Sequence, residues 1–175
     1  GEGFLKHVFK EVLGVEVETP FQRMTWHEGM ERFGSDKPDL RFGMELTDLS
    51  GALRGTAFRV FASALEKGSV RGINFKGGAD RMTRKEIDKL AEWVKDYGAK
   101  GLAWTRLAST GESSSYEKFL SEEERAAVRT AMGAEPGDLL FLVASEKNSV
   151  VFASLGALRC ELAARYNLID RSKYC

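Results

Sequence analysis

Apolar residues recur with helical spacing near the start of the chain. Within residues 4–13, positions i, i+3, i+4 and i+7 are apolar: Leu5, Val8, Phe9 and Val12. Gly14 follows as a helix stop. A second helix is predicted after Thr25, because Glu28 completes a capping box and Gly34 ends the segment. We expect both helices to pack against the rest of the fold.

The pattern changes near residue 53. Apolar and polar residues alternate through residues 56–65 and again through residues 69–75, with Lys67 and Gly68 between the two runs. Alternation with a period of two is typical of half-buried strands, and a short polar connection is typical of a hairpin. The sequence therefore predicts two antiparallel strands here.

Helices and strands alternate through the rest of the chain. Capping boxes at Thr83 and Ser121 predict helices that end at Gly98 and Gly133. Further predictions are a strand at 102–107, a polar loop at 109–115, a central apolar strand at 139–144, and a long helix from Ser149 to about Tyr166. This order indicates the α+β class: a two-layer domain with a largely antiparallel sheet of about four strands and helices on one face.

Composition describes a globular protein without a membrane span. Hydrophobic residues make up 43% and charged residues 30% of the chain, and no apolar run approaches the ~20 residues that a spanning helix needs. No signal peptide is visible at the N-terminus. Cys160 and Cys175 give neither metal-ligand spacing nor a disulfide framework, so we expect a reducing, cytoplasmic location.

The formal net charge is zero, but the charges are unevenly distributed. Residues 54–106 carry 12 basic and 6 acidic side chains, whereas the flanking segments are acidic. Zero net charge argues against an independent nucleic-acid-binding protein, while the basic middle segment favours local attraction to phosphate. The basic residues converge on one predicted strand end and the first turns of one helix: Arg71, Lys76, Arg81, Arg84, Lys85 and Lys89. Cations at a helix N-terminus oppose the macrodipole, so these residues either bind a partner or solvate the surface.

No motif for catalysis or metal binding stands out. His7 and His27 lack a second ligand at metal-binding spacing, and the chain has no G-x-S-x-G, no P-loop and no Cys/His pair in a suitable context. The string FKGGAD (75–80) fits a strand-ending turn better than a phosphate cradle. Trp93 and Trp104 are expected to pack in the fold rather than stack on bases. The residues alone indicate no catalytic residue and no metal site.

Residues 20–46, PFQRMTWHEGMERFGSDKPDLRFGMEL, closely resemble the string that follows the second class II motif in bacterial-type aspartyl-tRNA synthetases. Four later strings resemble, in the same order, the GAD insertion domain of that family: KEIDKLAEWVKDYGAKGLAW (85–104), KFLSEEE (118–124), GDLLFLVA (137–144) and LGALR (155–159). The departures are small. Trp26 and Phe33 stand where the family often has Tyr, and Gly29 replaces a helical Ala at a cost of about 1 kcal/mol.

The resemblance implies a fragment of a larger enzyme. It divides the chain into a catalytic-domain segment (1–53), the GAD insertion domain (54–156) and a helix returning to the catalytic domain (157–175). The family is a homodimeric ligase that attaches aspartate to tRNA with ATP and Mg²⁺. The resemblance places the aspartate- and ATP-binding motifs outside this chain. We therefore expect no cofactor, no metal and no catalytic activity in the fragment, which can be monomeric.

The resemblance also suggests two kinds of site residue. Near the acceptor side of tRNA, phosphates would be attracted by Arg71, Lys76, Arg81, Arg84 and Lys85. The charged turn lies, by this resemblance, at the junction between the catalytic domain and the insert; its residues are Asp36, Lys37, Asp39 and Arg41. A role in the junction is favoured over a chemical role. Two alternatives stay open. The insert is a structural brace without RNA contact, or the chain comes from an archaeal tRNA-dependent amidotransferase subunit, against which residues 20–46 argue.

Overall fold

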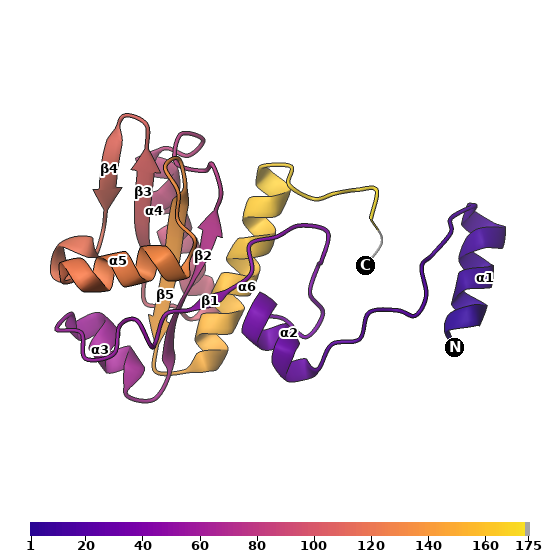
Figure 1. Cartoon of the computed structure of the whole chain (residues 1–175), viewed down its shortest axis with the longest axis horizontal. Helices are drawn as coiled ribbons and strands as arrows, with labels where there is room; N and C mark the ends of the chain where they lie inside the picture. The colour runs from indigo at the N-terminus through magenta and orange to yellow at the C-terminus, as the bar shows by residue number, and fades with distance from the viewer. Residues whose placement is uncertain (174–175) are drawn as a thin grey trace.

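The computed structural model describes residues 1–173 and is built around one open, antiparallel sheet of five strands (Figure 1). The strands lie in the order β1-β2-β5-β3-β4. Their bounds are Thr47–Asp48 (β1), Ser69–Phe75 (β2), Ala103–Ala108 (β3), Gly111–Ser114 (β4) and Leu139–Ser145 (β5). Strand β5 is central and pairs with both β2 and β3, which confirms the prediction from its apolar sequence. Cys175 lies outside the described residues.

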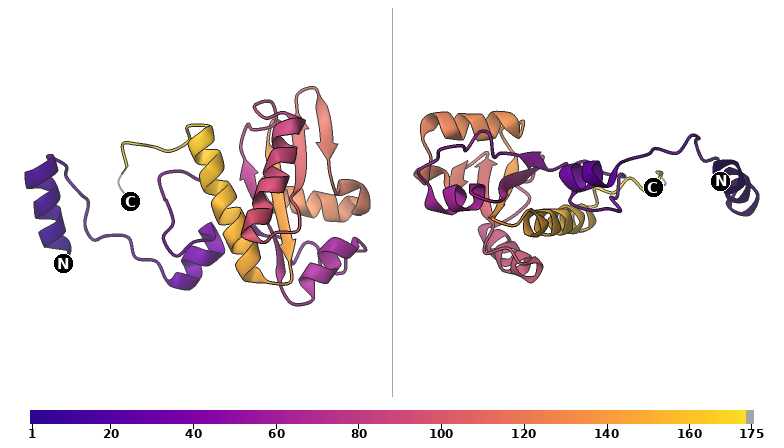
Figure 2. Two further views of the ribbon diagram at one scale, coloured as in Figure 1. Left: turned by 180° about the vertical axis from the view of Figure 1, so that it is seen from behind. Right: turned by 90° about the horizontal axis from the view of Figure 1, so that it is seen from below.

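Helices cover both faces of this sheet, as the view from below in Figure 2 shows. Their bounds are Glu2–Leu13 (α1), Trp26–Phe33 (α2), Arg59–Leu65 (α3), Arg84–Trp93 (α4), Glu122–Ala131 (α5) and Asn148–Arg165 (α6), with short 3₁₀ helices at Val94–Tyr97 (η1) and Glu117–Phe119 (η2). Because side chains alternate along a strand, β5 contributes to two apolar cores. Phe141 and Val143 belong to the core with α4 and α6, whereas Leu140 and Leu142 belong to the core with α3 and α5.

The α+β class and the antiparallel sheet are confirmed, but the layering differs from the prediction. We expected helices on one face of about four strands, and the domain instead has three layers around five strands. The physical reason lies in β5, where residues 139–143 are all fully buried. A strand buried on both faces requires apolar cover on both sides of the sheet.

The predicted strand at residues 56–65 is wrong, because most of this segment forms helix α3. Phe61 and Ala64 are three residues apart, share one helical face, and are buried against the sheet. The neighbour of β2 on that side is the two-residue strand β1. Strand β4 lies within residues 109–115, which were predicted as a polar loop. The sheet therefore contains two short edge strands that the sequence pattern did not reveal.

The predicted helix ends agree with the structure. Thr83 and Ser121 each form a complete capping box with the glutamate three residues later. Gly34 and Gly98 follow α2 and η1 in the left-handed conformation that favours glycine. These local signals fixed the helix boundaries because capping depends on neighbouring residues only.

The predicted domain boundaries do not coincide with breaks in the structure. Helix α6 is continuous from Asn148 to Arg165 and crosses the predicted division after residue 156. Strand β1 belongs to the sheet although it precedes residue 54. The division into residues 1–53, 54–156 and 157–175 stays a prediction.

Helix α1 lies apart from the sheet and is reached through an extended segment (Figure 1). Its apolar face is open: Phe4, Val12 and Leu13 are 70%, 72% and 61% exposed. The helix is confirmed, but no residue of α1 is buried, so the expected packing is absent among the described residues. Helix α2, in contrast, buries Phe33 against α6. No helix within residues 1–173 has the length and apolar character that crossing a membrane requires.

Candidate nucleic-acid interface and the junction turn

Three of the five predicted phosphate-binding residues lie together around the first turn of α4. The guanidinium of Arg84 lies 4.5 Å from the ring centre of Trp104, and its Nε donates to Asp88 Oδ1 at 2.9 Å. Trp104 is itself buried in the sheet, as predicted. The ring supports one face of the guanidinium, and the Arg84 side chain remains 64% exposed.

Arg81 is positioned in the same way just before the helix. Its guanidinium lies 4.9 Å from the ring centre of Tyr166 and 5.6 Å from that of Phe75, and Nη2 donates to the backbone oxygen of Tyr166 at 3.2 Å. Lys85 is exposed. Within residues 1–173, no carboxylate lies at ion-pair distance from Arg81 or Lys85. These two charges are therefore available to an external anion.

Two further cations extend this group. Lys89 and Arg165 lie near Glu86, where both help to hold the pKa of that carboxyl below its usual value; the main causes are hydrogen bonds from the Thr83 hydroxyl and backbone. We call the set Arg81, Arg84, Lys85, Lys89 and Arg165 the α4 basic surface. Arg165 was not predicted, because it lies at the far end of α6 in sequence and only the fold brings it here. Glu86, Asp88 and Glu161 neutralise part of this surface.

Arg71 and Lys76 lie elsewhere. Arg71 is 6% exposed, and its guanidinium forms ion pairs with Glu31 at 2.7 Å and Asp48 at 3.2 Å. Lys76 Nζ lies 2.9 Å from Glu135 and 3.0 Å from Asp138. Carboxylates of this chain compensate both charges, so their positions do not support phosphate binding, and their predicted role is untested.

The junction turn is organised by its own charges. Asp39 accepts from Arg41 in a two-pronged ion pair, with Nε at 2.9 Å and Nη2 at 2.8 Å, and also accepts from the Arg41 backbone nitrogen at 3.0 Å. The backbone oxygen of Arg41 accepts from the Asp170 nitrogen at 3.1 Å. Asp36 and Lys37 are exposed at the tip. The turn thereby contacts the segment after α6, and its role as a junction between domains stays a prediction.

Arg159 is the residue of this region that sequence reasoning missed. It is 1% exposed, and its guanidinium donates to the backbone oxygens of Asp39 at 2.7 Å, Phe42 at 3.0 Å and Gly43 at 3.1 Å. The rings of Phe42 and Phe33 lie 4.1 Å and 4.8 Å from its central carbon. Burial lowers the pKa of Arg159. Three carbonyl dipoles and two ring faces compensate the buried charge, and no carboxylate within residues 1–173 lies at ion-pair distance from it.

Glycines allow the close approach of backbones beside Arg159. A Cβ atom on Gly156 of α6 would lie 2.7 Å from the backbone oxygen of Gly34, and one on Gly34 would overlap the Phe152 carbonyl. Gly29 follows the same rule, since its Cβ would lie 2.9 Å from the Ser35 oxygen. Glycine at position 29 is therefore explained by the close approach of the turn, which offsets its cost in helix propensity.

Comparison with known proteins assigns the central part of this structure. The family model described as "GAD domain" matches residues 61–154, which is more than half of the chain. The chain belongs to the GAD domain family. The matched range begins within α3 and ends within α6. It therefore contains the sheet from β2 onward and the first four cations of the α4 basic surface. The junction turn and Arg159 lie outside the matched range.

Curated relatives match over a wider range. The chain is 55% identical over 174 residues to "Aspartate--tRNA(Asp/Asn) ligase" of Caldanaerobacter subterraneus subsp. tengcongensis. It is 53% identical over 175 residues to "Aspartate--tRNA ligase" of Clostridium perfringens and 49% identical over 174 residues to that of Shouchella clausii. Each alignment covers 99% of this chain and 29% of the relative, so the chain spans less than a third of their length.

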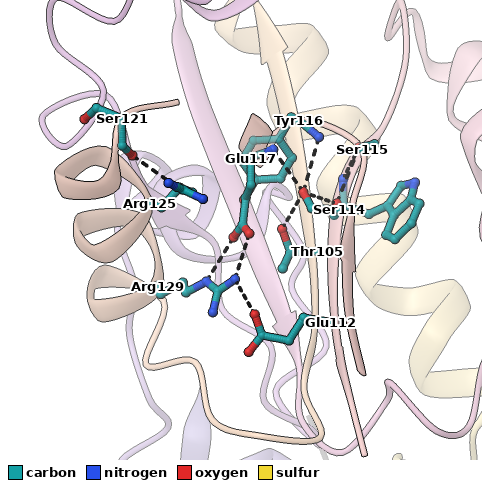
Figure 3. Close-up of polar contacts among 10 residues, drawn as sticks. Thr105, Glu112, Ser114, Ser115, Tyr116, Glu117, Ser121, Arg125 and Arg129 are labelled. Atoms are coloured by element: carbon teal, nitrogen blue, oxygen red, sulfur yellow. Dashed lines mark hydrogen bonds and ion pairs between the residues drawn. The ribbon is translucent and has the colours of Figure 1, made fainter. Parts of the chain in front are cut away.

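The opposite face of the GAD domain holds a second polar cluster, which is drawn in Figure 3. Arg129 of α5 contacts both oxygens of Glu117, at 3.0 Å and 2.7 Å, and donates to Glu112 of β4 at 2.9 Å. Ser114 accepts from Thr105 at 3.0 Å, and the buried Tyr116 follows it. Burial raises the pKa of Tyr116. These contacts join α5, β4 and η2, which indicates a structural role for the cluster.

An open hollow of about 350 Å³ lies beside the junction turn and is lined in part by Arg32, Arg41 and Lys173. Its charges are engaged, since Arg32 binds both Glu28 and Glu45 and Arg41 binds Asp39. Within residues 1–173, no three His, Cys, Asp or Glu side chains are grouped so that they could hold a metal ion. Cys160 is a free, exposed thiol on α6.

Proposed function

We propose that this chain is part of an aspartate–tRNA ligase, in which the GAD domain binds the phosphate backbone of tRNA near its acceptor side through the α4 basic surface. The identity of about 50% to such ligases over 99% of the chain supports the parent enzyme. The observation that supports the RNA contact is the grouping of Arg81, Arg84 and Lys85 around one helix end with exposed head groups. The guanidinium N–H groups of arginine and the ammonium group of lysine are the usual protein donors to phosphate oxygens.

The stacked arginines suit this role for a second reason. Tyr166 and Trp104 hold the planes of Arg81 and Arg84, so less side-chain entropy is lost when a phosphate binds. The partial neutralisation by Glu86 and Asp88 predicts modest affinity. A modest affinity fits an auxiliary contact in a larger tRNA interface rather than an independent binding domain.

The chemistry of the proposed ligase belongs to its other parts. We expect ATP, Mg²⁺ and aspartate to bind outside these residues, in a cytoplasmic homodimer. The direct check is adenylate formation by the 175-residue chain supplied with ATP, Mg²⁺ and aspartate, for which we expect no activity. Formation of aspartyl-adenylate by the chain alone would contradict this division of roles.

The RNA contact is tested in the full-length ligase by neutralising three charges together, with Arg81→Gln, Arg84→Gln and Lys85→Gln. We expect the KM for tRNA to rise several-fold while ATP–pyrophosphate exchange stays unchanged, since only the tRNA contact is weakened. A matched control neutralises three exposed cations on other elements, with Arg54→Gln, Lys118→Gln and Lys147→Gln. Equal KM values in the two triple variants would refute the proposed contact.

The brace hypothesis has an observation of its own in its favour. The burial of Arg159 against the turn and the Gly34–Gly156 approach fix the GAD domain firmly to the segment that precedes it. A pure brace predicts that replacing residues 54–156 with a short linker lowers the stability of the ligase and leaves tRNA affinity unchanged. The amidotransferase alternative is disfavoured, because the similarity to ligases includes residues 1–53.

A further inference from the structure

The chain enters and leaves the GAD domain through two segments that contact each other. We call residues 34–46 and 166–173 together the neck. The backbone nitrogen of Asp170 donates to the backbone oxygen of Arg41, which joins the two segments directly. Figure 1 shows them side by side on the α6 side of the sheet. The direction of the GAD domain relative to the rest of a larger protein therefore depends on how firmly the neck is held.

Arg159 is the side chain that fastens the neck to α6. Its three hydrogen bonds go to backbone oxygens within five consecutive residues, and these partners are 116 to 120 positions away in sequence. Because the acceptors are carbonyls, the contact fixes the path of the backbone whatever side chains the turn carries. The Phe42 ring lies against the guanidinium at 4.1 Å and closes the site on one side.

The chemistry of this contact requires arginine. A planar guanidinium presents several N–H donors in a fixed fork and can serve three acceptors at once, whereas an ammonium is a compact, strongly hydrated point charge. Burying the charge carries a desolvation cost that an apolar side chain at this position would avoid. A buried charge with directional donors fixes one geometry, which an apolar contact does not.

We propose that Arg159 is a positioning residue: it fixes the neck against α6 and thereby sets the direction in which the GAD domain presents its α4 basic surface. The consequence for tRNA rests on the proposed function, while the hold on the neck does not. We expect loss of Arg159 to leave the sheet and its two apolar cores intact, because the residues that its guanidinium contacts belong to neither core. We expect the same loss to loosen the backbone of residues 39–43, which Arg159 holds.

The first test measures the backbone mobility of residues 40–43 in the 175-residue chain. Arg159→Lys keeps the charge, and Arg159→Gln keeps two donors. Arg125→Lys is the matched control, since the Nε of Arg125 also donates to a backbone oxygen, that of Ser121 at 3.4 Å. We expect the heteronuclear ¹⁵N NOE at residues 40–43 to fall in both Arg159 variants and to stay unchanged at α4 and in the control. Unchanged values at residues 40–43, or failure of both Arg159 variants to fold, would overturn the positioning role.

The second test uses the full-length ligase and separates positioning from general stability. We expect Arg159→Lys to raise the KM for tRNA several-fold, because only the fraction of molecules with a correctly directed domain is competent. ATP–pyrophosphate exchange should stay unchanged, and Arg125→Lys should change neither value. A parallel fall in exchange activity would indicate a structural role and overturn the proposal. If the triple variant of the α4 basic surface leaves KM unchanged, the proposed function fails, and the NOE measurement still decides the role of Arg159.

Discussion

The close contact between Gly34 and Gly156 gives the sharpest prediction about stability. In Gly156→Ala, the new Cβ would lie 2.7 Å from the Gly34 oxygen and 3.1 Å from the Phe33 oxygen. An ordinary contact begins at 3.4 Å, so α6 and the turn must separate by about 0.7 Å. Both opposing atoms belong to the backbone, which cannot rotate away as a side chain could.

The magnitude is a balance of two terms. Overpacking costs about 1–3 kcal/mol, and alanine regains up to about 1 kcal/mol of helix propensity over glycine. From the middle of the first range, the net loss of unfolding free energy is about 1 kcal/mol, which corresponds to a fall in Tm of about 2–4 °C for a chain of this size. Separation of the turn from α6 also lengthens the bonds of Arg159, which lies one helical turn further along.

Differential scanning calorimetry of the 175-residue chain measures this change. Gly3→Ala is the matched control, because Gly3 is also a helical glycine and its Cβ would meet nothing within 4 Å. We expect Gly3→Ala to leave Tm unchanged, since α1 has no buried residue. A Tm of Gly156→Ala equal to or above that of the wild type would refute the close packing of the turn on α6.

Two further predictions concern the polar contacts of the GAD domain. Burial alone would raise the pKa of Asp138, but hydrogen bonds from Asn74, Gly77 and Lys76 outweigh it and hold the pKa below the ordinary 3.8. The ionised Asp138 therefore stabilises the folded state above pH 3.8. This stabilisation is lost as the pH falls through the lowered pKa of the folded state. Thermal melts should thus show a gap between wild type and Asp138→Asn at neutral pH that narrows in acid, and a gap that widens in acid would contradict this sign. Arg129→Met should lower the unfolding free energy measured in urea by about 2 kcal/mol, because it leaves the nearly buried Glu117 carboxylate unpaired. Addition of Glu117→Leu should restore part of this loss, and a double variant no more stable than Arg129→Met would contradict the reasoning.

Local sequence signals predicted the helices well, and tertiary packing explains the errors. Capping boxes and terminal glycines depend on residues within one turn, so the ends of α4 and α5 were visible in the sequence. Residues 56–65 contain both an alternating pattern and the i, i+3 pair of Phe61 and Ala64. The helix forms because α3 can bury that pair against β2 and β5, and no local rule contains this information.

The candidate site was predictable only in part, for the same reason. Arg81, Arg84 and Lys85 lie close together in sequence, and the fold keeps them together. Arg71 and Lys76 were indistinguishable from them by type and spacing, but distant carboxylates compensate both charges. Arg159 appeared in the quoted string LGALR, yet its acceptors are more than 100 residues away. Contacts of this range are set by the topology of the sheet and by the path of the neck.

The salt dependence of tRNA binding tests the central claim most directly. Binding of tRNA to the full-length ligase and to its Arg81→Gln, Arg84→Gln, Lys85→Gln variant would be measured across a range of salt concentrations. Each phosphate contact contributes about 0.7–0.9 to the slope of log Kd against log salt, so loss of these contacts should reduce the slope by about 2. A slope that is unchanged in this variant would show that the α4 basic surface does not contact tRNA, and would leave the GAD domain as a brace.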